Sequence, residues 1–124
     1  MPQRRYRLRL WSATALAASG TLETGVIDCR TSDPEGLVLK VSSATGTADA
    51  KLEVSCSNDG TTFNAYTAQD PIVSSTNTAY SSTQPEDFHL ILVPWAPYLK
   101  LKLTELSASN TDTVVTGDLW MTEI

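Results

Sequence analysis

Apolar and polar residues alternate in several short stretches of this chain, and this two-residue period is typical of β-strands that bury one face. The clearest case is residues 98–104, where Leu99, Leu101 and Leu103 alternate with two lysines. In residues 48–57 every other position is again apolar or small: Ala50, Leu52, Val54 and Cys56. Each stretch predicts a strand with one face in the core and the other toward solvent.

A turn follows the second of these stretches directly. Asn58, Asp59 and Gly60 tolerate positive φ, and such residues between two extended runs are a strong hairpin signal. An extended pattern resumes at residues 63–67. We therefore expect a β-hairpin here, around which the rest of the chain is organised.

Five further stretches carry strand patterns: residues 4–11, 25–29, 36–43, 87–93 and 113–123. Residues 32–36 have the composition of a turn, and the two prolines within 94–98 exclude a helix and predict a corner. About eight short strands with no helical pattern predict an all-β fold, an antiparallel β-sandwich of the jelly-roll or immunoglobulin-like type. A closed barrel is the alternative.

The first predicted strand has an apolar face and an arginine face. Its apolar face carries Tyr6, Leu8 and Leu10, and its other face carries Arg5, Arg7, Arg9 and Trp11. Trp120 likewise falls opposite the apolar residues of the last strand, and Trp95 lies in the proline corner. Because tryptophan is enriched at interfaces, three tryptophans off the core face predict a second covered face or a contact surface.

The pattern is weakest in residues 68–85. A loop of this length inside a compact domain usually carries function or touches a partner. One short edge strand at residues 72–75 would make it ordinary. Residues 87–93 are nearly continuously apolar, as in a strand covered on both faces.

Charge divides the chain unevenly. The 124 residues carry a net charge of −5, yet four of the nine basic residues lie within the first ten positions: Arg4, Arg5, Arg7 and Arg9. We therefore predict a basic strand or arm at residues 1–12 and a single sandwich domain at residues 13–124. Such an arm attracts acidic neighbours, including further copies of the chain. Its alternative role is to protect a solvated edge strand. We do not expect nucleic acid as a partner, since the rest of the chain is acidic.

Candidate catalytic groups are sparse. The only histidine, His89, lies inside a strand pattern, and the adjacent carboxylates Glu86 and Asp87 point to opposite faces of a strand. Asn58, Asp59 and Asp112 supply too few oxygen ligands for calcium. We predict no catalytic residue, no metal and no cofactor, and hence no enzyme.

The two cysteines and the N-terminal segment bear on the compartment. Cys29 and Cys56 either bridge or stay free, and we expect free thiols. The basic start followed by Ala13 to Ala18 superficially copies a signal peptide, but its apolar part is too weak. No apolar run reaches membrane-spanning length, so we expect no membrane association and synthesis in the cytoplasm.

Four segments together resemble a known class of proteins. They are Gly20-Thr-Leu-Glu-Thr-Gly-Val-Ile-Asp-Cys29, Gly36-Leu-Val-Leu-Lys-Val41, the run from Ala48 to Phe63 with its Ser-Asn-Asp-Gly-Thr-Thr-Phe end, and Ala96-Pro-Tyr-Leu-Lys-Leu-Lys-Leu103. Over residues 13–122 the chain is similar to small virion proteins of tailed bacteriophages. Those are β-sandwich structural or capsid decoration proteins present in many copies on the particle. The arginine-rich start is not part of this pattern.

The resemblance implies a non-enzymatic virion protein, made in the host cytoplasm, whose partners are copies of itself and a capsid or other virion protein. We expect its assembly contacts at Arg4, Arg5, Arg7, Arg9, Trp11 and Trp120. The strand, turn and aromatic layout also resembles discoidin-like and carbohydrate-binding sandwiches. In that alternative a cell-surface glycan would stack on Trp95, Tyr98 and Tyr80.

Overall fold

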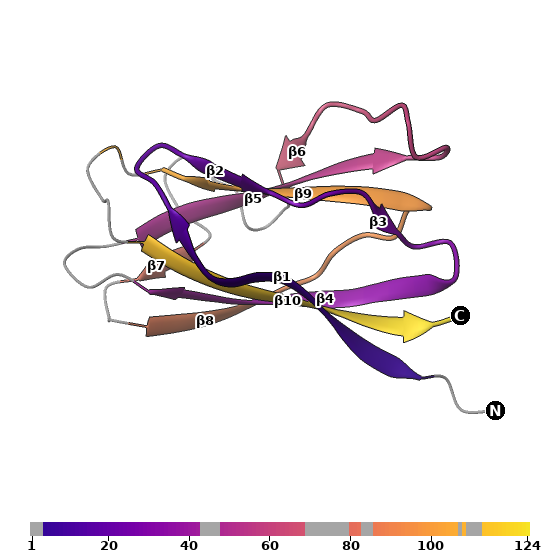
Figure 1. Ribbon diagram of the computed structural model, residues 1–124, viewed down its shortest axis with the longest axis horizontal. Helices are drawn as coiled ribbons and strands as arrows, with labels where there is room; N and C mark the ends of the chain where they lie inside the picture. The colour runs from indigo at the N-terminus through magenta and orange to yellow at the C-terminus, as the bar shows by residue number, and fades with distance from the viewer. Residues whose placement is uncertain (1–3, 43–47, 69–79, 83–85, 107, 109–112) are drawn as a thin grey trace.

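The chain folds into two antiparallel sheets that face each other (Figure 1). The computed structural model describes residues 4–42, 48–68, 80–82, 86–106, 108 and 113–124. The first sheet has the order β1-β10-β4-β8, formed by Arg5–Leu16, Thr113–Glu123, Ser32–Ser42 and Glu86–Ile91. The second has the order β2-β9-β5-β6, with β3 on β9 and β7 on β5; its strands are Thr21–Glu23, Tyr98–Glu105, Ala48–Ser57, Thr67–Ala68, Ile27–Asp28 and Tyr80–Ser82.

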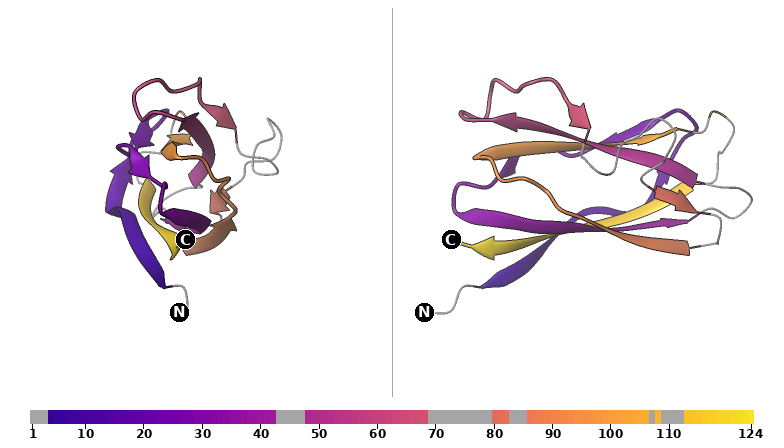
Figure 2. Two further views of the ribbon diagram at one scale, coloured as in Figure 1. Left: turned by 90° about the vertical axis from the view of Figure 1, so that its right-hand side faces the viewer. Right: turned by 180° about the vertical axis from the view of Figure 1, so that it is seen from behind.

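The strand order is that of a jelly roll. Short strands β2 and β3 pair with the same strand β9, and β6 and β7 pair with the same strand β5, so each pair occupies one edge position. The described strands thus occupy eight positions, and strands that follow each other in the sequence mostly lie in opposite sheets, as Figure 2 shows. The predicted all-β sandwich is confirmed, and its topology is the jelly-roll alternative.

The core lies between the two sheets and follows the predicted alternation. In β9 the burial alternates without exception, with Leu99, Leu101 and Leu103 fully buried. The facing sheet contributes Leu37, Leu39, Val41, Val115, Leu119 and Met121, all with at most 1% of their surface exposed. Since consecutive residues point to opposite faces, this burial also determines which side chains of these strands face outward.

A bulge in β1 changes the direction of Trp11. Arg9 pairs with Asp118 and Trp11 with Gly117, so Leu10 is an extra residue without a partner on β10. This shift of one residue moves Trp11 from the arginine face to the core, where only 5% of its surface is exposed. The prediction that Trp11 lies on the surface beside the arginines is therefore wrong.

Three other boundaries differ from the expected ones. Residues 32–36, predicted as a turn, form the start of β4 instead. The pairing of β4 with β10 shifts register there, between Gly36 and Pro34. The hairpin arm expected at 63–67 is a short strand at Thr67–Ala68, and the long partner of β5 is β9. The predicted division between residues 12 and 13 falls inside β1, which pairs with β10 on both sides of it. The edge strand proposed at 72–75 lies outside the described residues.

The two cysteines are free, as expected. Cys56 pairs with Leu99 on one side of β9, while the Cys29 amide donates to the Pro97 carbonyl on the other side. Their Cα atoms lie two strand spacings apart across the sheet and two residues apart along the strands, which gives a distance of roughly 12 Å. A disulfide requires less than about 7 Å, so the native fold holds the two thiols apart.

Gly117 makes room for Trp11, which gives a stability test. A Cβ on Gly117 would lie 2.8 Å from Cε3 of Trp11, whereas a Cβ on Gly25 would meet nothing within 4 Å. We expect Gly117→Ala to lower the free energy of unfolding by about 1–3 kcal/mol, because a well-packed core resists added volume. Gly25→Ala is the matched control. Urea denaturation measures both, and equal midpoints for the two variants would contradict the packing of Trp11 against Gly117.

Candidate functional site

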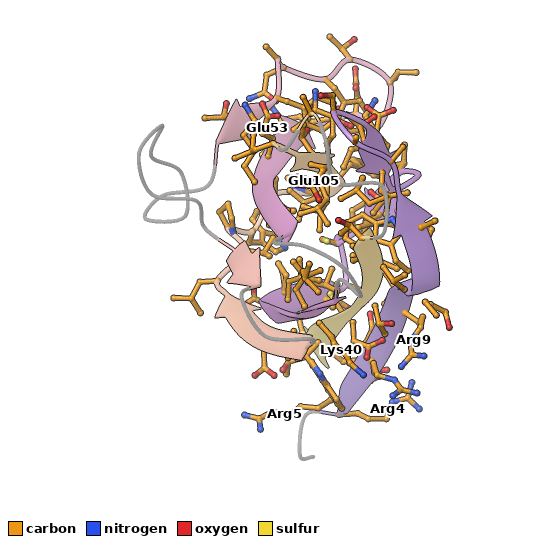
Figure 3. All side chains as sticks on the ribbon, turned by 90° about the vertical axis from the view of Figure 1, so that its left-hand side faces the viewer. Arg4, Arg5, Arg9, Lys40, Glu53 and Glu105 are labelled. Atoms are coloured by element: carbon orange, nitrogen blue, oxygen red, sulfur yellow. The ribbon has the colours of Figure 1, made fainter. Side chains whose placement is uncertain are left out.

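The arginines of the first strand are paired with acids of the same chain. Arg9 donates from Nε and Nη2 to the two carboxylate oxygens of Asp118 at 2.6 and 3.1 Å. At one end of the strand, Nη2 of Arg4 donates to Oε1 of Glu123 at 2.6 Å. Nε of Arg5 lies 3.3 Å from Oε2 of Glu35. Figure 3 shows Arg4, Arg5 and Arg9 projecting outward along β1. The predicted basic arm is thus a row of cross-strand ion pairs rather than an isolated positive patch.

Arg7 differs from the other arginines of this row. Its Nε lies 4.0 Å from Asp118, at the limit of an ion pair, and Asp118 already accepts two hydrogen bonds from Arg9. The Arg7 side chain is 52% exposed, while that of Asp118 is 15% exposed. The hydrogen bond to Asp118 also raises the pKa of Arg9 above its ordinary value. Arg7 therefore retains donors for a further acceptor.

Trp120 lies beside Arg7 on the outer face of the first sheet. The two residues are register partners on β10 and β1, and Trp120 is 40% exposed between buried neighbours on the same strand. The predicted position of Trp120 outside the core is confirmed. We name the group formed by Arg5, Arg7, Arg9, Asp118 and Trp120 the arginine–tryptophan face.

Part of the outer face of the second sheet, over β5 and β9, is covered by the chain itself. Residues 58–66 leave β5 and pass over the side of the sheet that faces away from the core (Figure 1). Asn64 fastens this segment: its Oδ1 accepts from the Cys56 amide at 2.7 Å, and its carbonyl accepts from the Ser55 hydroxyl at 2.6 Å. Ser55, on the outer side of β5, is consequently buried.

Two lysines of β9 contact aromatic rings of this covering segment. Lys100 Nζ lies 4.2 Å from the ring centre of Phe63, and Lys102 Nζ lies 4.6 Å from that of Tyr66. Cation–π contacts of this kind contribute about 0.5–1 kcal/mol at exposed sites. Burial raises the pKa of Tyr66, and the nearby Glu23 carboxylate adds to the shift. The alternating pattern predicted only solvent beside these lysines and gave no sign of the cover.

The turn at the start of the covering segment is held by one carboxylate. Oδ1 of Asp59 accepts from the amides of Thr61 and Thr62, both at 2.9 Å, and from the Ser57 hydroxyl. These hydrogen bonds lower the pKa of Asp59 to about 2. Gly60 takes the positive φ, 81°, that the predicted turn requires. The Asp59 carboxylate thus has a structural role here.

The three aromatic residues expected to bind a glycan do not form one platform. Tyr98 pairs with Ser57 and Tyr80 with Ala50, so they lie seven residues apart along β5, roughly 23 Å. The Tyr98 ring contacts Arg30, whose Cζ is 5.3 Å from the ring centre. The side chain of Tyr80 lies outside the described part of the structure.

Of the two aromatics whose side chains are described, Trp95 is the one that is both exposed and fixed. Its Nε1 donates to the carbonyls of Cys29 and Ser32 at 2.9 and 3.2 Å, and 49% of the residue is exposed. Nearby, Arg30 binds Asp28 through both Nε and Nη2. This ion pair lowers the pKa of Asp28 to about 2. The corner therefore presents a rigid indole near a charged pair.

Neither a metal centre nor a membrane-spanning helix is found among the described residues. No three side chains of the metal-binding types lie close enough together there to hold a metal ion. No helix in the described ranges is long and apolar enough to span a membrane. His89 pairs with Leu39 in the β4–β8 ladder, and its side chain is outside the described part.

Comparison with known proteins shows similarity of fold only. The sequence matches no family model and no curated protein. The fold is similar to a chain in the structure of infectious bursal disease virus, Gx strain, with a TM-score of 0.61 and 13% sequence identity. The match covers 98% of this chain and 32% of that chain, so this chain spans about a third of its length. The class defined by the fold is thus the jelly-roll β-sandwich.

A second solved structure is a family 35 carbohydrate binding module from an environmental isolate. It has 12% sequence identity and a TM-score of 0.43, over 86% of this chain and 69% of that chain. A likeness this distant carries no argument about the present chain.

The low pKa of Asp59 predicts a specific loss of stability in acid. Its folded pKa of about 2 lies below the ordinary value of 3.8. The carboxylate therefore stabilises the fold above pH 4, and this contribution is lost as the pH falls from about 4 to 2. Asp59→Asn keeps the acceptor oxygen but does not titrate. We expect urea unfolding of this variant to depend less on pH across that window; parallel pH curves for variant and wild type would contradict the role of Asp59.

Proposed function

We propose that this chain is a non-enzymatic structural protein of a virus particle, present in many copies and bound to further copies of itself and to a capsid or other virion protein. A bacteriophage capsid decoration or stabilising role is the specific form that the sequence resemblance supports. The protein would be made in the host cytoplasm and located in the virion. The observation that carries the proposal is a jelly-roll body with an arginine–tryptophan face on its outside.

The asymmetry between the two outer faces supports a role in contacts. In the second sheet, residues 58–66 cover the outer face of β5 and part of that of β9 through Asn64 and the two lysine–aromatic contacts. On the arginine–tryptophan face, by contrast, the Arg7 side chain is 52% exposed and Trp120 is 40% exposed. Tryptophan and arginine are among the residue types most enriched at the energetically dominant positions of protein interfaces. An exposed face of this composition fits a protein partner better than a small substrate.

Self-association tests the proposal. The weight-average mass of the purified chain, measured by sedimentation equilibrium, should rise with protein concentration and fall at high salt, because exposed ion pairs are screened. Negative-stain electron microscopy of concentrated samples should show multimers. A mass equal to that of the monomer at every concentration and salt would contradict assembly from copies of this chain.

A second candidate function is glycan binding at the Trp95 corner. The observation in its favour is an indole held rigidly by two hydrogen bonds with half of its surface exposed. A fixed aromatic face suits a sugar ring because little conformational entropy is lost on binding. The Asp28–Arg30 ion pair lies within residues 28–32, the segment that supplies the two carbonyls bound by Trp95, and it offers polar groups for a glycan.

A glycan array tests this second candidate. Binding to one class of glycan that Trp95→Ala abolishes and Trp120→Ala preserves would support the Trp95 corner as the site. Both variants should fold, since each residue is substantially exposed. A signal that survives Trp95→Ala, or an array without any signal, would contradict it.

A further inference from the structure

The arginine–tryptophan face consists of complementary pairs that lie side by side on two strands. Arg9 on β1 is level with Asp118 on β10, and Arg7 is level with Trp120. Each row therefore joins a cation to a group that binds cations: a carboxylate in one row and an aromatic ring in the other. The β1 column is positive, and the β10 column is negative and aromatic.

This arrangement is self-complementary under a two-fold rotation. A half-turn about an axis parallel to the strands, between β1 and β10, exchanges the two columns and keeps each residue at its own level. Arg9 of one copy then faces Asp118 of the other, and Arg7 faces Trp120. In such an isologous contact the same pair of residues meets twice. A two-fold axis could also lie in the plane of the face, perpendicular to the strands and between the Arg7 and Arg9 rows. That axis would bring Arg7 of one copy against Arg9 of the other.

We infer that the arginine–tryptophan face binds the same face of a second copy of this chain, with the two-fold axis along the strands between β1 and β10. This inference rests on the proposed function and specifies the partner and geometry of one contact. A uniformly acidic partner would meet Asp118, and a uniformly basic partner would meet the arginines. A surface with the same alternation satisfies both signs, and a second copy supplies it.

The state of the individual side chains favours this contact. Asp118 is nearly covered, but Arg7 is half exposed and only at the edge of contact with it. Arg7 can therefore reach an external group without breaking the Arg9–Asp118 hydrogen bonds. Trp120 keeps 40% of its surface exposed next to Arg7. Covering the indole removes apolar surface from water, and the guanidinium gains an aromatic face.

The edge of β1 is poorly suited to the alternative, which is strand-to-strand extension of the sheet. Its pairing with β10 shifts register between Arg9 and Trp11 and again between Trp11 and Thr14. Ala13 has a positive φ of 45°. Bulges and charged side chains are the usual means by which proteins block pairing at a sheet edge. The outer face of β1, rather than its edge, is thus the surface available for contact.

The contact is small. The face is two strands wide and five residues long, from Arg5 to Arg9, so its footprint is roughly 10 Å across the strands and 17 Å along them. A standard interface buries about 800 Å² on each partner. One such contact is weak by itself, and it contributes to a stable particle when many copies are held together. We therefore expect association only at high protein concentration.

Charge exchange between two variants tests the geometry directly. Arg9→Glu alone places two acids opposite each other at the interface, and Asp118→Lys alone places two bases there, so each variant should associate less than wild type. An equimolar mixture should restore association, because the introduced carboxylate of one copy then faces the introduced ammonium group of the other. Sedimentation equilibrium measures the three samples. Circular dichroism verifies that each variant is folded.

The Asp28–Arg30 pair provides the matched control. It is also an exposed ion pair, but Asp28 belongs to β3 of the second sheet, so the pair is not part of the arginine–tryptophan face. Asp28→Lys, Arg30→Glu and their mixture should associate as wild type does. In a further variant, Trp120→Ala, the association constant should fall at least about tenfold, while Trp95→Ala should leave it unchanged.

The outcomes separate this inference from the proposed function. If wild type associates but Arg9→Glu, Asp118→Lys and Trp120→Ala associate equally well, the inferred contact is overturned while assembly of many copies stands. If the mixture of the two charge variants associates no better than each alone, the two-fold geometry is overturned. If wild type remains monomeric at every concentration, both the inference and assembly from copies of this chain are overturned.

Discussion

The structure depends on one constraint: leucine and valine side chains at alternate positions of the long strands must be covered by a second sheet. Leu99, Leu101 and Leu103 from β9 meet Leu39 and Leu119 from the facing sheet within one buried cluster. The free energy gained is roughly 25 cal/mol for each Å² of apolar surface removed from water. Because the period of a strand is two, this burial also sends the intervening residues outward. The outward positions of Arg7 and Trp120 are consequences of the same core.

Strand positions were predictable where the alternation is uninterrupted. This holds for 98–104, for 48–57 and for 113–123, where Leu119 and Met121 are buried and Trp120 is not. Prediction failed where one residue is added to a strand. The bulge at Leu10 leaves no mark in the pattern of β1, and the burial of Trp11 depends on Gly117, a residue 106 positions away. Single-strand periodicity contains no information about such a partner.

The candidate site was predictable only in part for the same reason. The positions of the arginines followed from the first strand alone, but their acceptors Asp118, Glu35 and Glu123 lie on other strands. Their pairing depends on sheet order, which the sequence pattern did not provide. Trp95, Tyr98 and Tyr80 were grouped by residue type, and strand register separates Tyr80 from Tyr98 by most of the length of β5. Composition identified the right kinds of side chain, while topology decided which of them meet.

The pairing of β1 with β10 has a consequence for synthesis. Arg9 and Asp118 are 109 residues apart in sequence, and β10 is the strand that joins β1 to β4. The first sheet therefore cannot close until the residues of β10 have left the ribosome. Contacts of such long range slow folding, since a large loop must be ordered before they form. Nascent chains that lack β10 would leave one edge of β1 and one edge of β4 without hydrogen-bond partners, and intermediates with unpaired strand edges are the natural substrates of chaperones.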